Sequence, residues 1–177
     1  LFAQGGPGRM NGGNPNGTCP ACAYAQTALQ PLTSDEAATL RKMREEEKLA
    51  RDVCEFLYEK WNVRIFRNIS ASEQRHFDAI GTLLTRYGVA DPANGERGVF
   101  TDTALQTLYL ELTGSGDDSL KAALEAGVKI EKLDLADLEA AIAATTRPDL
   151  KRVYVNLLKG SLNHLDAFES NLELIVQ

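Results

Sequence analysis

Histidine and cysteine are scarce in this chain, and positive charges are outnumbered by negative ones. The 177 residues include two histidines, three cysteines and an excess of acidic side chains that gives a net charge of −6. This charge argues against nucleic acid and anionic membrane surfaces as partners. No apolar run approaches the roughly 18 residues that a membrane-spanning helix needs, so we expect no membrane span. The composition, 44% hydrophobic and 25% charged, is that of a globular domain.

The spacing of the cysteines excludes two common kinds of site. Cys19 and Cys22 form a single Cys-x-x-C, and no histidine follows them as it does in a c-type haem attachment site. No second pair is present to complete a four-cysteine zinc site within the chain. A disulfide, a free thiol pair and capture of a soft metal such as copper all remain open for this pair. Cys54, far from the others, is expected to be a small core residue, with a ligand role as the alternative.

The chain divides by composition into a tail and one domain. Residues 1–31 are rich in glycine, asparagine and proline and predict an irregular tail, whereas residues 32–177 carry helical patterns. The first four residues, Leu-Phe-Ala-Gln, are similar to the end of a signal peptide that is cleaved near Ala3. We therefore expect an exported protein, periplasmic or extracellular; a cytoplasmic location is the alternative.

The periodicity of apolar residues predicts an all-α domain. A capping box, formed by Thr33 and Glu36, marks the start of the first helix, Gly88 ends the second, and Pro148 suits the first turn of the last. The expected helices span about 33–61, 64–87, 102–112, 118–145 and 148–175. The two short connections predict two antiparallel hairpins. Joined by a long crossover with a short extra helix, they form the arrangement of a ferritin-like four-helix bundle.

Each long helix has an apolar seam that is interrupted near its middle by an ionisable residue. The interruptions are Glu47 on the first helix, Glu73 and His76 on the second, Glu131 and Asp134 on the third, and His164 on the fourth. A buried carboxylate costs several kcal/mol unless it is paired or bound to metal, so four such defects point to a shared cause.

The interruptions also lie at matching depths. Glu131 and His164 each lie about 22 to 24 Å from the loop that joins their helices, at 1.5 Å per residue. Glu47 and His76 lie about 18 to 21 Å from theirs, so each carboxylate should face a histidine. The neighbouring Glu45 and Glu46 fall off the seam and are expected to be exposed to water.

This constellation is typical of a metal site. Residues 73–76 read Glu-x-x-His, which places a carboxylate and an imidazole on one helical face, as in di-iron carboxylate proteins. The fourth helix departs from the full pattern, because Ser161 stands where a second glutamate is expected. Asp134 could replace that carboxylate or accept a hydrogen bond from an imidazole. The predicted metal ligands are Glu47, Glu73, His76, Glu131, His164 and Asp134. Two iron ions suit this donor set best, and manganese, zinc or copper are alternatives.

Four stretches carry a resemblance to a known family. They read REEEKLARD at 44–52, ASEQRH at 71–76, IEKLDLADL at 130–138 and GSLNHL at 160–165. In order and spacing the chain from about residue 32 to 174 resembles an uncharacterised bacterial and archaeal ferritin-like family, domain of unknown function 2202. The resemblance implies a ferritin-like fold and a di-iron-type site related to that of rubrerythrin. It implies no particular activity, because the family has none agreed.

Three functions follow as hypotheses. The first is a di-iron oxidoreductase or ferroxidase whose two ions are bridged by Glu73 and Glu131 and which acts on O2, peroxide or Fe(II). The second is a non-catalytic metal-binding or sensing module whose Cys-x-x-C tail contacts a partner or a soft metal. The third is a metal-free bundle in which Arg51, Arg75 or Lys129 pairs with the buried carboxylates. A homodimer is the expected assembly, with metal ions and a small oxidant as the other partners.

Overall fold

The computed structural model describes residues 29–176. The predictions for the tail and its first residues, including Cys19 and Cys22, lie outside the described residues. The described residues form five α-helices and no strand, which confirms the all-α prediction. The helices are α1 (Ser34–Trp61), α2 (Arg64–Tyr87), α3 (Thr103–Gly116), α4 (Leu120–Ala144) and α5 (Pro148–Val176). None of the helices in residues 29–176 is long and apolar enough to cross a membrane.

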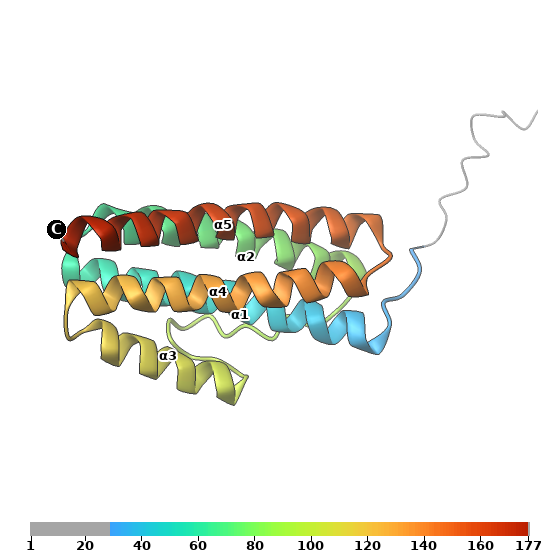
Figure 1. Ribbon diagram of the computed structural model, residues 1–177. Helices are drawn as coiled ribbons and strands as arrows, with labels where there is room; N and C mark the ends of the chain where they lie inside the picture. The colour runs from blue at the N-terminus through green and yellow to red at the C-terminus, as the bar shows by residue number, and fades with distance from the viewer. Residues whose placement is uncertain (1–28, 177) are drawn as a thin grey trace, which may run out of the picture. The chain divides into compact units, whose positions relative to one another are not determined.

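The four long helices lie side by side, and α3 lies outside them (Figure 1). α1 packs against α2 and α4, α5 packs against α4 and α2, and α3 contacts α1 and α4. Connections of two and three residues join α1 to α2 and α4 to α5, so each of these pairs is an antiparallel hairpin. A crossover of residues 88–102 leads from α2 to α3.

Local sequence signals set most of the helix ends. Thr33 and Glu36 form the expected capping box, and Gly88 adopts a left-handed φ of 65° after α2. The short helix was predicted over about 102–112 with its stop at the glycine-rich residues 114–116; α3 includes these residues and ends at Gly116. Trp61 donates a hydrogen bond of 2.8 Å from Nε1 to the carbonyl of Gly116, and this tertiary contact holds a glycine-rich turn in the helix.

The ionisable residues of the seams form a layer between two apolar clusters. One cluster gathers apolar side chains of the four long helices: Leu49, Val53 and Leu57 of α1, Phe66 and Ile69 of α2, Leu124 and Ile130 of α4, and Phe168 of α5. The other contains Leu40, Ile80, Leu138 and Leu157. In each of the four long helices the ionisable residues fall between these two clusters. The structure therefore encloses the ionisable residues in the middle of the core.

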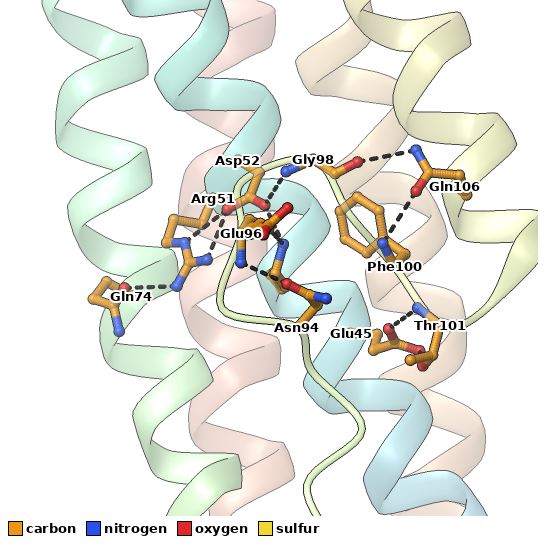
Figure 2. Close-up of polar contacts among 11 residues, drawn as sticks. Glu45, Arg51, Asp52, Gln74, Asn94, Glu96, Gly98, Phe100, Thr101 and Gln106 are labelled. Carbon is orange, nitrogen blue, oxygen red and sulfur yellow. Dashed lines mark hydrogen bonds and ion pairs between the residues drawn. The ribbon is translucent and has the colours of Figure 1, made fainter.

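The structure corrects the prediction for Glu45 and Glu46, which are 4% and 3% exposed rather than solvated. Thr101 donates to the Glu45 carboxylate from its backbone N–H and its hydroxyl, both at 2.7 Å (Figure 2). Asp52, also buried, accepts a hydrogen bond of 2.9 Å from the N–H of Gly98. The crossover therefore covers Glu45 and Asp52 of α1, whereas Glu46 shares the partner Lys42 with Asp137 of α4.

Candidate metal centre

Glu73 stands at the middle of the enclosed layer. Its Oε2 lies 2.8 Å from Nδ1 of His76 on the same helix, and its Oε1 lies 2.6 Å from Nδ1 of His164 on α5. The imidazole rings are 5.5 Å apart between centroids. One carboxylate thus touches two histidines, one with each oxygen.

The other two glutamates each join one of these histidines. Oε2 of Glu47 lies 3.2 Å from Nδ1 of His76, and Oε1 of Glu131 lies 3.6 Å from Nδ1 of His164. The predicted pairing of carboxylates with histidines by depth is therefore confirmed. Glu131 meets only His164, so Glu73 is the one glutamate of the layer that spans both halves.

Two groups of donor atoms could each hold a metal ion. The ligand atoms of Glu47, Glu73 and His76 lie within 4.8 Å of one another, and so do those of Glu73, Glu131 and His164. Glu73 belongs to both groups. Two carboxylates and one imidazole per group are the oxygen and nitrogen donors that iron, manganese and zinc accept.

Several of these atoms are buried without a hydrogen bond. The unpartnered atoms are Nδ1 of His76, Nδ1 of His164, Oε1 of Glu47, Oε1 of Glu73 and Oδ1 of Asp134. The Nδ1 atoms are close to carboxylate oxygens but are not aligned with them as hydrogen-bond donors, which is the arrangement expected of atoms that point at a common ion. An orphaned buried polar atom costs about 1–3 kcal/mol, so the donor set fits a metal better than a metal-free core.

The cations that could replace a metal are engaged elsewhere. Arg51 donates to Asp52 and Gln74, Lys129 to Glu111, and Arg75 to the carbonyl of Ala71. None of these contacts reaches a carboxylate of the two groups, which counts against the metal-free hypothesis.

Comparison with known proteins gives the family. The model of an uncharacterised protein domain, DUF2202, matches residues 36–176. The chain belongs to the DUF2202 family. The resemblance of the four sequence stretches to domain of unknown function 2202 is confirmed, whereas the relation to ferritin-like proteins and rubrerythrin stays a prediction.

A relative and two solved structures are similar to this DUF2202 chain. The uncharacterised protein MJ0754 of Methanocaldococcus jannaschii is 50% identical over 140 residues, which cover 78% of this chain and 76% of the relative. The crystal structure of hypothetical protein MJ0754 from Methanococcus jannaschii is 47% identical, with a TM-score of 0.82 over 84% of this chain and 86% of that one. A DUF305 fragment from Deinococcus radiodurans, 15% identical, has a TM-score of 0.62 over 81% of this chain and 99% of its own, a likeness of fold alone.

Asp134 and Ser161 fill the remaining side of the layer in this DUF2202 protein. The Ser161 hydroxyl donates to Oδ2 of Asp134 at 2.6 Å and also contacts the carbonyl of Leu157. Asp134 is 6% exposed but belongs to neither three-ligand group. The structure thus places Asp134 against Ser161, the residue that stands in place of the second motif's glutamate.

Burial and the charges of neighbouring groups shift the pKa values of the glutamates and of His164 in different directions. Burial raises the pKa of Glu131 to about 8 and that of Glu47 well above its usual range, and neighbouring carboxylates add to both effects. Burial would also raise the pKa of Glu73, but the close imidazoles of His164 and His76 lower it to about 2. Burial opposes the charge on His164, yet Glu131 and Glu73 raise its pKa to about 10. Without a metal, Glu73 is therefore the site glutamate that stays ionised between the two imidazoles.

Gly160 is a site residue that the sequence analysis missed. A Cβ atom built there would lie 2.5 Å from both Cε1 and Nε2 of His76, so only a glycine lets the ring lie against α5. Nδ1 of the same ring lies near the carboxylates of Glu47 and Glu73. The available signal was a glycine in a helix interior, which costs about 1 kcal/mol relative to alanine and indicates a close approach.

Proposed function

We propose that this protein binds two transition-metal ions, iron in the first place, in a ferritin-like four-helix bundle related to the rubrerythrin type, and uses them in redox reactions of O2, peroxide or Fe(II). The observation that carries the proposal is Glu73, whose two oxygens reach the Nδ1 atoms of two histidines on different helices. A carboxylate in this position is suited to bridge two ions.

The ligands divide between the two positions. His76 and Glu47 would hold one ion, His164 and Glu131 the other, and Glu73 would be shared. With neutral imidazoles, the three glutamates leave one positive charge on a pair of divalent ions. The buried carboxylate of Asp134 beside the site would balance that charge.

Bound ferrous ions would supply the electrons that reduce O2 or peroxide. The chain contributes the setting: the site glutamates are at most 2% exposed, which limits access of bulk water. Ser161 keeps Asp134 in one orientation through its 2.6 Å hydrogen bond, close to the shared carboxylate.

The first test is the metal content of protein purified without chelator, followed by titration with Fe(II) under anaerobic conditions. We expect up to two ions per chain in the wild type and in Glu139→Gln, which removes an exposed carboxylate of α4. Absence of bound iron, manganese, zinc or copper, together with no uptake of Fe(II), would refute the proposal.

A second function is supported by Ser161. With a serine in place of the second motif's glutamate, Glu73 is the one carboxylate that links the two halves of the site, which suits stable metal binding or sensing without turnover. Stopped-flow mixing of the Fe(II)-loaded protein with O2 or peroxide separates the two functions. Fast oxidation that depends on oxidant concentration supports the redox protein, and slow oxidation insensitive to peroxide supports the binding module.

A further inference from the structure

A line of carboxylates continues from the candidate metal centre toward the surface between α1 and α4. On α4, Glu131, Asp134 and Asp137 follow one another at intervals of three residues and so share one face of the helix. The side chain of Glu131 is 2% exposed and that of Asp137 is 30% exposed, so the row rises from the core to the surface. On α1, Glu46 precedes the site residue Glu47.

Glu46 is the least explained member of this row. Its side chain is 2% exposed, and neither carboxylate oxygen makes a hydrogen bond. Glu46 shares its ion-pair partner Lys42 with Asp137, so its carboxylate lies beside the acidic row of α4. Asp134 likewise has a buried unpartnered oxygen, Oδ1. These buried atoms are acceptors that receive no hydrogen bond within residues 29–176.

A cationic side chain already occupies the outer end of the row. Nζ of Lys42 lies 2.7 Å from Oδ1 of Asp137 and 3.3 Å from Oε1 of Glu46, and 46% of the Lys42 side chain is exposed. Among the described residues, Lys42 is the cation that forms the ion pairs of both acids. A flexible ammonium at this point occupies the position where an arriving metal cation would first meet buried oxygens.

We propose that Glu46, Asp134 and Asp137 form an uptake route that passes divalent cations from the surface to the two-metal site, with Lys42 displaced as each ion enters. The inference rests on the proposed function. The route differs from a third resident site, because within residues 29–176 the donor atoms that converge as a metal site are those of the two groups around Glu73. Carboxylates spaced along a path attract a cation and let it move on.

The test is the rate of cobalt(II) uptake by metal-free protein, followed by visible absorption in a stopped-flow instrument at low salt. Glu46→Gln keeps the shape of the side chain and removes the carboxylate that would bind a passing cation, and we expect about tenfold slower uptake with two ions bound at the end. Asp137→Asn, at a partly exposed position, should also slow uptake. Lys42→Gln should accelerate it. Glu139→Gln carries the same change of charge on the exposed side of α4 and should match the wild type.

Thermal unfolding monitored by circular dichroism checks that each variant is folded before its uptake rate is compared. Equal rates for Glu46→Gln, Asp137→Asn and Glu139→Gln would overturn the route. A loss of one bound cobalt ion at equilibrium in Glu46→Gln would also overturn it, because Glu46 would then be a resident ligand. Failure of the proposed function gives a different result, since the wild type itself would then bind no cobalt.

Discussion

Glu73 is the residue on which both metal positions depend. Since each of its oxygens faces a different imidazole, Glu73→Gln should weaken both ions, whereas Glu47→Gln should weaken the ion at His76 alone. We expect at least about 100-fold weaker binding of the affected ions, because loss of a ligand exceeds the 10–100-fold effect of its supporting contacts. Equilibrium dialysis against manganese(II) would show one tight ion in Glu47→Gln and none in Glu73→Gln. The same stoichiometry in both variants would contradict the shared role.

A substitution at Gly160 tests whether the close approach of α5 sets the orientation of the His76 ring. Gly160→Ala should push the His76 ring away, because the new methyl group would lie 2.5 Å from two ring atoms. We expect about 10–100-fold weaker binding of one ion and little change in the other. Gly114→Ala is the matched control, since a Cβ there meets nothing within 4 Å and should leave binding unchanged. The measurement is manganese(II) affinity by calorimetry, and equal affinities in the two variants would show that His76 is not constrained by α5.

At the scale of elements, the crossover is fixed to α1 through buried charge. Nζ of Lys48 lies 2.5 Å from Oδ2 of Asp52, and both side chains are fully buried. Asp52→Asn should cost about 3–5 kcal/mol of unfolding free energy in urea, because it leaves the ammonium of Lys48 buried with a weaker partner. Glu59→Gln removes a carboxylate that pairs with Arg97 at the surface and should change the urea midpoint little. Similar small effects in both variants would mean that the crossover is held by other contacts.

The same elements show how far sequence alone reaches. The helical period and the short loops predicted the bounds of α2 and the contact between Glu47 and His76. Both signals are local, so they can be read from the sequence. The burial of Glu46 and the full length of α3 depended on packing between elements distant in sequence. The division of roles between Glu73 and Glu131 was also not predictable, since it depends on which carboxylate reaches the histidines of both α2 and α5.

At the scale of the whole molecule, metal binding should couple to protons and to stability. The folded pKa of Glu131, about 8, lies above its usual 4.5, and that of His164, about 10, lies above its usual 6.5. Groups with raised pKa values stabilise the fold below their usual pKa and lose that contribution as pH rises through the raised value. The metal-free protein should therefore become less stable between about pH 6 and pH 9. The lowered pKa of Glu73 matters only in acid, where its contribution is lost as pH falls through about 2.

Binding of divalent ions requires these ligands without their protons, so uptake should release protons and strengthen with pH. We expect the Tm of chelator-treated protein to fall from pH 6 to pH 9, while the increase in Tm on adding manganese(II) grows over the same range, because tighter binding adds more to stability. Calorimetry in two buffers with different ionisation enthalpies would count the protons released per ion near pH 7. The variant Glu73→Gln should show no increase in Tm with metal at any pH. If the Tm curves with and without metal run parallel over this pH range, metal binding is not coupled to the protonation of these groups. The raised pKa values would then reflect the buried core alone.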